Sequence, residues 1–305
     1  MPKTLLILLG PTAVGKTDLS IEIAKYYNTE IISCDSRQIY REMRIGTAVP
    51  DQQTLEIIPH HFIRSHSIHD YYNASKFEEE VLERLELLFQ TKDVVLMTGG
   101  SMMYIDALCK GIDDLPEVDD ELRKSLMERM ETEGIESLRN ELRYHDPVYY
   151  NEVDLRNPKR ILHALEICLM TGKPYSSFRI NQPKKRPFNI IKLGLNLDRE
   201  VLYNRINQRV DVMFGEGLEK EALSLYPFRH LNSLNTVGYR ELFDYFDGKM
   251  TIEEAKEKIK ANSRKYARKQ LTWFRRDSEI VWFTPDMKNE IIAFGDQQLK
   301  AENQE

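Results

Sequence analysis

A short apolar run followed directly by a glycine-rich loop constrains this chain more than any other feature. Residues 4–9 read TLLILL, and residues 10–17 read GPTAVGKT, which has the spacing G-x-x-x-x-G-K-T. An amphipathic stretch, DLSIEIAKYY, follows at residues 18–27. A buried strand, a loop of this spacing and a helix together define a P-loop, whereas a chance glycine-rich turn rarely has all three. The sequence therefore predicts an α/β fold.

The loop is suited to bind phosphate groups. Its backbone N–H groups turn toward an anion, its lysine adds a positive charge, and the following helix points its positive dipole end at the same place. The Thr17 hydroxyl can ligate the Mg²⁺ that accompanies a polyphosphate. The loop does not by itself distinguish a nucleotide such as ATP from the diphosphate of another metabolite. The residues predicted to bind the phosphates are Gly10, Pro11, Thr12, Ala13, Val14, Gly15, Lys16 and Thr17.

Further strands and helices alternate along the chain, which predicts a parallel sheet flanked by crossover helices. Buried strands are expected at residues 30–33, 93–97, 189–197 and 279–283. Helices are expected at residues 77–90, 199–213, 218–226 and 251–275, the last beginning with the capping box TIEE. The final residues, AENQE, are expected to form a frayed tail.

The segment 115–187 shows no strand pattern. It reads as helices over residues 121–134, 135–145 and 157–172, separated by Gly134, by DPVYY and by Asn157-Pro158. We therefore predict a P-loop catalytic core made of residues 1–114 and 188–305. An all-helical insertion, residues 115–187, interrupts it and is expected to move as a domain.

The charge of the chain is unevenly distributed. The net charge is −6, yet residues 156–192 contain nine Lys or Arg and one acid, Glu166. Residues 256–276 contain nine more against Glu257 alone. Such tracts are typical of an anionic partner bound on one face, although two solvated helix faces would look similar.

The remaining composition indicates a cytoplasmic protein. The three cysteines, Cys34, Cys109 and Cys168, are far apart and lack metal-ligand spacing, as expected for reduced thiols. Met1 to Thr4 leads straight into a strand rather than a signal peptide, and the apolar runs are too short to span a membrane. No pattern resembles a dimerisation seam, so we expect a monomer.

Residues that follow the strands are informative because ligands bind beyond the carboxyl ends of parallel strands. Asp35 follows the second strand and is placed to accept a proton from an attacking nucleophile, although it could instead cap a helix. The segment TGGS, residues 98–101, follows the third strand where a motor ATPase would have an aspartate. The site is thus predicted to transfer a group to a bound acceptor.

Later elements add basic and aromatic residues. Arg205 and Arg209 share a helix face, where they could bind leaving phosphates or pair with Asp198 or Asp211. The segment SRKYARKQLTWFRR, residues 263–276, interleaves cations with aromatic rings, which suits RNA bases and phosphates but also a half-buried amphipathic helix. The histidines of residues 60–69 match no zinc template, and polar packing is expected there instead: His60, His61, His66 and His69.

Several motifs together resemble one family. From Thr4 to Trp282 the chain contains, in order, GPTAVGKT, IISCDSRQIYREMRIGTAVP, HHFI, TGGSMMYIDAL, RVDVM with GLEKEA, TVGYREL and RKQLTWFRR. This series resembles tRNA dimethylallyltransferase, the bacterial tRNA isopentenyltransferase. The resemblance implies that the loop holds dimethylallyl diphosphate. It also implies prenyl transfer to the N6 amine of the adenosine 3′ of the anticodon, which gives N6-isopentenyladenosine and pyrophosphate.

The resemblance also implies roles for individual residues. Asp35 would take the amine proton, Arg209 would stabilise the leaving diphosphate, and Ser101 stands where the family usually has threonine. Mg²⁺ on Thr17 would be the cofactor, and Gln38 would read the adenine edge. His163 occupies a position where an arginine is expected. The positions implied to contact tRNA are Asp35, Ser36, Arg37, Gln38, Ser101, Arg123, Lys159, Arg160, Ile161, Leu162, His163, Arg268, Lys269, Gln270 and Trp273.

Three other functions share some of these features. A small-molecule kinase has the same loop and a carboxylate after the second strand, but leaves both basic tracts without a purpose. A prenyltransferase acting on free adenine nucleotides shares the core, but does not need a large basic insertion. An RNA-binding module with a vestigial loop is disfavoured by the complete set of Lys16, Thr17 and Asp35.

Overall fold

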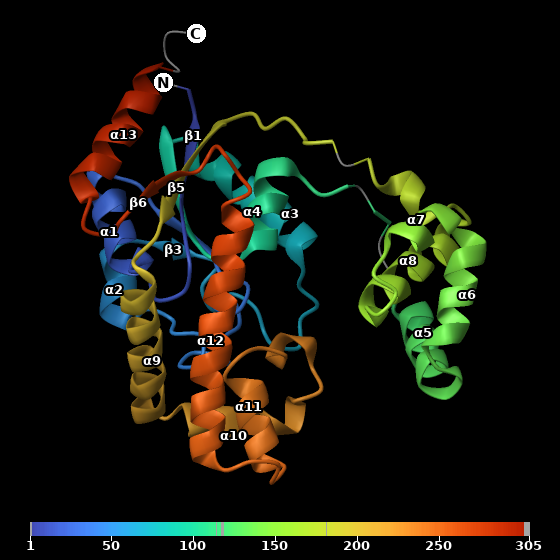
Figure 1. Cartoon of the computed structure of the whole chain (residues 1–305). Helices are drawn as coiled ribbons and strands as arrows, with labels where there is room; N and C mark the ends of the chain where they lie inside the picture. The colour runs from blue at the N-terminus through green and yellow to red at the C-terminus, as the bar shows by residue number, and fades with distance from the viewer. Residues whose placement is uncertain (1, 114, 117–118, 181, 302–305) are drawn as a thin grey trace. The chain divides into compact units, whose positions relative to one another are not determined.

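The computed structural model describes residues 2–113, 115–116, 119–180 and 182–301. The chain divides into two compact units (Figure 1). The core unit comprises residues 1–109 and 185–305, and the helical unit comprises residues 110–184. These divisions fall a few residues before the expected boundaries at 114/115 and 187/188. The expected frayed tail lies mostly in residues 302–305, outside the described residues.

A six-stranded parallel sheet forms the centre of the core unit, in the order β3-β2-β4-β1-β5-β6. Figure 1 labels β1, β3, β5 and β6. The predicted strands are all present, within a few residues of their expected ends. The strand β3 was not predicted, because two residues are too few for a periodic pattern. The strands are β1 (Thr4–Leu9), β2 (Ile31–Cys34), β3 (His60–His61), β4 (Val94–Gly99), β5 (Asn189–Leu195) and β6 (Val281–Phe283).

The first strand explains why the sheet is covered on both faces. All six of its residues are buried. Leu5 and Ile7 belong to one hydrophobic cluster, whereas Leu6 and Leu8 belong to another. Because successive side chains of a strand point to opposite faces, a continuous apolar run requires helices on both sides.

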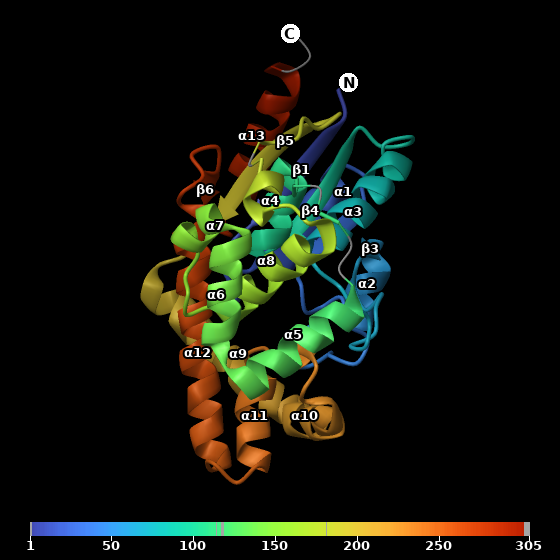
Figure 2. The same ribbon diagram turned by 90° about the vertical axis from the view of Figure 1, so that its right-hand side faces the viewer.

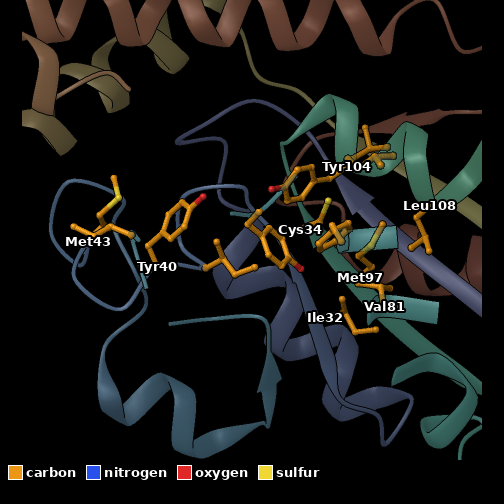
Figure 3. Close-up of a cluster of buried hydrophobic side chains, with 14 of the residues drawn as sticks. Ile32, Cys34, Tyr40, Met43, Val81, Met97, Tyr104 and Leu108 are labelled. Atoms are coloured by element: carbon orange, nitrogen blue, oxygen red, sulfur yellow. The ribbon is translucent and has the colours of Figure 1, made fainter. Parts of the chain in front are cut away.

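Helices pack against these two faces. One cluster includes Val81 and Leu108 from the helices α3 and α4, together with Ile32, Cys34 and Met97 from the sheet (Figure 3). The other includes residues of α1, α9 and α13. The helices of the core unit are α1 (Lys16–Tyr26), α2 (Gln52–Ile57), α3 (Ala74–Leu88), α4 (Met102–Lys110), α9 (Arg199–Glu216), α10 (Leu218–Leu225), α11 (Tyr239–Phe246), α12 (Ile252–Phe274) and α13 (Lys288–Ala301).

The longest helix, α12, begins at the predicted capping box. The Thr251 N–H donates to Glu254 Oε2 at 2.8 Å, and the Glu254 N–H donates to Thr251 Oγ1 at 3.2 Å. The helix lies beside α11 (Figure 2). The helices α2, α4, α11 and α13 were not predicted from the sequence.

The helical unit has a hydrophobic core of its own, which includes Leu126, Leu138, Leu142 and Leu165. Within its described residues it contains helices and no strand, as predicted for this segment. One expectation was wrong: DPVYY does not merely separate two helices, because Asp146 caps a short helix that starts at Pro147. The helices are α5 (Asp120–Glu133), α6 (Ile135–His145), α7 (Pro147–Glu152) and α8 (Pro158–Thr171). None of the described helices of either unit is long and apolar enough to cross a membrane.

Candidate active site

Three loops of the core unit meet at one edge of the sheet. In the strand register Leu9 pairs with Gly99, and Gly99 pairs with Cys34. The next residues along each strand, Gly10, Gly100 and Asp35, therefore follow three neighbouring strands at the same level. The register places the P-loop and Asp35 at one site, as the sequence predicted.

The P-loop connects β1 to α1 and curls around its own lysine. Gly15 has a φ of 106°, a conformation that suits glycine. Lys16 Nζ donates to the carbonyl oxygens of Gly10 at 3.0 Å and Pro11 at 2.7 Å. Burial, reinforced by the nearby positive charge of Arg209, lowers the pKa of Lys16 to about 7, although Asp35 opposes this shift. The loop therefore holds a lysine that would gain a proton when an anion binds.

Two pockets adjoin at this edge of the sheet. The loop pocket has a volume of about 350 Å³ and is lined by residues 12–18 of the P-loop region together with Gln38, Gly100 and Arg205. The side pocket has a volume of about 550 Å³. The pockets share four lining residues: Thr12, Asp35, Arg209 and Tyr266. A carboxylate and a guanidinium thus stand where one pocket passes into the other.

The side pocket combines an apolar wall with basic residues. Its apolar wall comes from α9, α10 and α12, and its basic residues come from the loop after β2, from α11 and from α12. A ligand that is apolar at one end and enters past positive charge would suit it. The apolar residues are Ile206, Val210, Met213, Leu218 and Ile259, and the basic ones are Arg37, Arg240, Lys265 and Lys269.

Backbone hydrogen bonds hold Asp35 in place. Its Oδ1 accepts from the N–H groups of Arg37 at 2.9 Å and Gln38 at 3.3 Å. Within the described part of the chain, no hydrogen bond to Oδ2 is found. These bonds resemble those of an N-cap residue, but they close a turn, because no helix begins after Asp35. One carboxylate oxygen remains to accept a proton.

Ser101 braces the loop that carries Asp35. It is 6% exposed, and its Oγ accepts from the Ser36 N–H at 2.8 Å. It is not among the residues that line either pocket. Tyr266 lies nearby: burial of its hydroxyl and the charge of Asp35 raise its pKa, although 37% of the residue is exposed, and a hydrogen bond with Ser101 opposes the shift.

The two arginines of α9 both reach the site. Arg209 donates to the Thr47 carbonyl at 3.4 Å, and burial lowers its pKa although Asp35 opposes this. Arg205 donates to the Val14 carbonyl of the P-loop at 3.2 Å. Neither makes the surface ion pair considered as an alternative: Asp198 caps α9, and Asp211 pairs with Lys256 and Lys260.

Gln38 lines the loop pocket, but its amide is already engaged. Its Nε2 donates to the carbonyl oxygens of Thr47 at 3.1 Å and Ala48 at 3.0 Å. Arg37 similarly donates to the Ser233 carbonyl at 2.8 Å. To pair with an adenine edge through both its NH₂ group and its oxygen, Gln38 would have to break one of these hydrogen bonds.

The expected RNA-contacting residues of α12 divide into two groups. Gln270 is 2% exposed, and Trp273 donates to Asp106 Oδ2 at 2.8 Å, so both tie α12 to the rest of the core unit. Arg268 and Lys269 are exposed. The structure therefore leaves Arg268 and Lys269 at the surface, whereas the amide of Gln270 and the indole N–H of Trp273 are hydrogen-bonded within the core unit.

The expected residues of the helical unit are similarly divided. Ile161 is fully buried, so its side chain cannot contact RNA as expected. Arg123 makes two hydrogen bonds, at 2.6 and 2.9 Å, to the buried Glu166, and His163 lies 3.5 Å from the same carboxylate. Leu162 packs against the core of the unit, whereas Lys159 and Arg160 are exposed in the first turn of α8.

Part of the first basic tract has a structural role. Lys192 is 7% exposed and pairs with Asp277 at 2.8 Å and Glu279 at 2.7 Å, and Arg186 pairs with Glu78.

The four histidines of residues 60–69 make polar or aromatic contacts. The contacts are His60 with the Ile58 carbonyl, His61 with Glu30, His66 with Glu80 and His69 with Phe228. Across the described residues no cluster of three or more His, Cys, Asp or Glu could hold a metal ion.

The P-loop lysine and Arg209 of α9 both lie near the Asp35 carboxylate, where two pockets meet, and this arrangement suits a P-loop transferase. The family model described as IPP transferase matches residues 38–277, so the chain belongs to this family of prenyltransferases. It is 58% identical to tRNA dimethylallyltransferase 1 of Phocaeicola vulgatus, over 96% of this chain and 98% of that protein. It is 57% identical to tRNA dimethylallyltransferase 1 of Bacteroides fragilis, over 98% and 99%.

Two solved structures are also similar to this chain. The full-length tRNA isopentenylpyrophosphate transferase of Bacillus halodurans is 33% identical, with a TM-score of 0.71 and 99% coverage of both chains. A eukaryotic dimethylallyltransferase acting on tRNA is 27% identical, with a TM-score of 0.77 over 89% of this chain and 70% of that one. The fold predicted from the sequence, a P-loop α/β core with helices, is confirmed.

Proposed function

We propose that the protein transfers the dimethylallyl group of dimethylallyl diphosphate to the N6 amine of the adenosine 3′ of the anticodon in tRNA. The products are N6-isopentenyladenosine and pyrophosphate. One observation supports this reaction above all: Asp35 and Arg209 line both pockets, so they stand where a donor in one meets an acceptor in the other. The names of the relatives describe the same reaction class.

The loop pocket is suited to the diphosphate of the donor. Backbone N–H groups of the loop and the N-terminus of α1 attract an anion, and Lys16 and Arg209 add charge. Diphosphate binding would draw Lys16 away from the carbonyls of Gly10 and Pro11 and raise its pKa again. The five-carbon group would extend toward the apolar wall of the side pocket.

In the proposed reaction, the lone pair of the adenosine N6 forms a bond to C1 of the dimethylallyl group as the bond from C1 to the diphosphate oxygen breaks. The electron pair of that bond leaves with pyrophosphate, whose charge Lys16 and Arg209 stabilise. The proton of the amine passes to Asp35, whose Oδ1 is oriented by the backbone of Arg37 and Gln38. Ser101 supports the loop of Asp35 from behind.

Mg²⁺ fits the residues of the loop pocket. Thr17 is exposed at the start of α1 and lines this pocket together with Asp35, so a hydroxyl and carboxylate oxygens are available to a hard cation. We propose that Thr17 and the diphosphate oxygens hold the ion, which when bound neutralises charge on the leaving group.

The acceptor is a macromolecule in this proposal. A base that reacts in a pocket must leave its stack, and the basic residues around the side pocket suit the phosphates on either side of it. Lys159 and Arg160 lie in the first turn of α8, where a helix N-terminus also favours phosphate. Arg268 and Lys269 add exposed cations on α12. We place the monomeric protein in the cytoplasm, where its tRNA substrate occurs and its cysteines stay reduced.

A direct experiment tests the proposal. The purified protein is mixed with Mg²⁺ and an unmodified anticodon stem-loop, in parallel with dimethylallyl diphosphate or ATP, and the RNA is weighed by mass spectrometry. We expect one added prenyl group, only with the prenyl donor, and none when the target adenosine is replaced by guanosine. An unmodified RNA with both donors would contradict the proposal. In matched mixtures with free AMP or another small acceptor in place of the RNA, phosphate transfer from ATP would indicate a kinase, and prenylation of AMP but not of RNA would indicate a nucleotide prenyltransferase.

A further inference from the structure

A short turn, residues 44–48, lies between the two pockets of the core unit. Gly46 and Thr47 line the side pocket, and Ala48 lines the loop pocket. Two backbone hydrogen bonds close the turn. The Ala48 N–H donates to the Ile45 carbonyl at 2.9 Å, and the Val49 N–H donates to the Arg44 carbonyl at 3.1 Å. Its position makes it part of the wall that both ligands would contact.

One carboxylate of α10 binds the backbone of this turn. Glu221 Oε2 accepts from the N–H groups of Arg44 at 3.0 Å and Ile45 at 2.8 Å, and its Oε1 accepts from the Gly46 N–H at 2.9 Å. Three successive N–H groups on one carboxylate form a charge-assisted network, which is stronger than bonds between neutral groups. Glu221 thus determines where the turn lies.

Tyr239, the first residue of α11, completes this network. Its hydroxyl donates to Glu221 Oε1 at 2.6 Å, and the residue is fully buried. A Cβ added to Gly46 would lie only 2.7 Å from the Tyr239 ring, so the turn approaches the ring as closely as a glycine allows. The blocks GLEKEA and TVGYREL, which no predicted role explained, supply these two residues.

The carbonyl groups at the end of the turn bind two residues of the site, Arg209 and Gln38. The Thr47 carbonyl accepts from Arg209 at 3.4 Å and from Gln38 Nε2 at 3.1 Å. The Ala48 carbonyl accepts from Gln38 Nε2 at 3.0 Å. A chain of direct contacts therefore runs from Glu221 and Tyr239 through the turn to Arg209.

We infer that Glu221 and Tyr239 are positioning residues that place Arg209 for the diphosphate, acting through the turn 44–48. A role of these two residues in catalysis rests on the proposed function, whereas their effect on diphosphate binding does not. Neither side chain is among the residues that line the loop pocket or the side pocket. Their contribution is the location of the Thr47 carbonyl, to which the guanidinium of Arg209 donates.

The test uses full-length Glu221→Gln and Tyr239→Phe, each with and without Arg209→Ala. The amide of glutamine has one acceptor oxygen and cannot serve all four donors, whereas phenylalanine keeps the ring against Gly46. Inorganic pyrophosphate binding is measured by calorimetry, and thermal unfolding is recorded in parallel. Glu219→Gln, two residues earlier in α10, is the matched control. We expect Glu221→Gln to weaken pyrophosphate about tenfold, Tyr239→Phe less, and neither to have an effect once Arg209 is absent.

The outcomes separate the two proposals. An equal loss of pyrophosphate affinity with and without Arg209 would overturn the inference, because the carboxylate would then act on the fold as a whole. An unchanged affinity in Glu221→Gln would overturn it too. In the prenyl-transfer assay the same variant should raise the KM for the prenyl donor more than it lowers kcat. If the wild-type protein transfers no prenyl group but the pyrophosphate results hold, the proposed function fails and the positioning role stands.

Discussion

The side chain of Gln270 joins the phosphate loop to the loop after β4. Its Oε1 accepts from the Thr12 N–H at 3.0 Å, and its Nε2 donates to the Gly100 carbonyl at 2.8 Å. The residue is 2% exposed and comes from α12, far along the chain from either loop. One amide thereby links two loops that follow neighbouring strands of the sheet.

Replacing Gln270 by leucine should therefore loosen the P-loop. The Thr12 N–H and the Gly100 carbonyl lose their partners, and an unsatisfied buried group costs about 1–3 kcal/mol of folding free energy. We expect a lower melting temperature and weaker pyrophosphate binding by calorimetry. Thr272→Ala, at an exposed position of the same helix, is the control and should change neither quantity. Wild-type affinity in Gln270→Leu would show that the bridge does not shape the loop.

Asp35→Asn should separate catalysis from binding. Asparagine keeps an oxygen that can accept from the N–H groups of Arg37 and Gln38, but it cannot take up a proton as a carboxylate does. We expect the single-turnover rate of prenyl transfer to fall by about 10²–10⁴. Pyrophosphate affinity should be kept or increased, because a negative charge near the loop has gone. Asp51→Asn, at the exposed cap of α2, serves as the control. Transfer at the wild-type rate would exclude Asp35 as the base.

Lys16 should take up a proton when diphosphate binds. Its pKa is lowered to about 7, so at pH 8 the lysine of the free protein is largely neutral, and the bound anion should restore its charge. Calorimetry of pyrophosphate binding in two buffers of different ionisation enthalpy measures the proton uptake. We expect Lys16→Met to take up about one proton fewer and to bind pyrophosphate roughly 10- to 150-fold more weakly. Equal proton uptake by both proteins would place the titrating group elsewhere.

The same lysine should make the stability of the free protein depend on pH. The pKa is near 7 in the folded protein and 10.5 in an ordinary lysine, so between these values the unfolded chain binds more protons. The free energy of unfolding should therefore rise with pH across this window. Urea unfolding at pH 7 and pH 9.5 should show a smaller rise for Lys16→Met than for the wild-type protein. An identical rise in both would contradict the lowered pKa.

Arg123 should matter for the stability of the helical unit. It pairs with Glu166, which is 1% exposed, and although burial acts to raise the pKa of Glu166, hydrogen bonds from His163 and Arg123 lower it overall. Removing one partner of such a pair costs about 3–5 kcal/mol. Hydrogen exchange in peptides from residues 119–180 should be much faster in Arg123→Ala. Arg129→Ala, which breaks a more exposed pair with Glu141, should cost about 1 kcal/mol or less.

This pair also has a defined pH dependence. Because the pKa of Glu166 is lowered on folding from its ordinary value of 4.5, its contribution is present above that value. It is lost as the pH falls through the lower pKa of the folded protein. Hydrogen exchange of the helical unit, corrected for the intrinsic rate, should therefore increase below pH 4.5 in the wild-type protein. Glu166→Gln should remove this step, and a step that persists in the variant would have another origin.

Much of the fold could be predicted because its signals are local. The run TLLILL, the loop GPTAVGKT and the box TIEE each specify a strand, an anion site or a helix start through residues that are neighbours in the chain. The two-residue β3 and the six-residue α2 escaped prediction because each is too short for a pattern of burial to repeat several times. Tertiary packing also favours the short helix in DPVYY: the carboxylate of its N-cap, Asp146, accepts from the Tyr149 N–H and is held in place by the N–H and hydroxyl of Ser176.

The sequence by itself determined that Lys16 and Asp35 lie at the same end of the sheet, because each follows a buried strand and the alternation of strands and helices makes those strands parallel. It could not show that the side chains of Gln270 and Trp273 form hydrogen bonds within the core unit while Arg268 and Lys269 are exposed, since all four residues share one helix. Nor could it show that Glu221 binds a turn more than 170 residues earlier in the chain. Those contacts depend on which surfaces meet when the sheet and its helices pack. The tertiary structure alone therefore decided which polar side chains brace the site and which remain to bind a ligand.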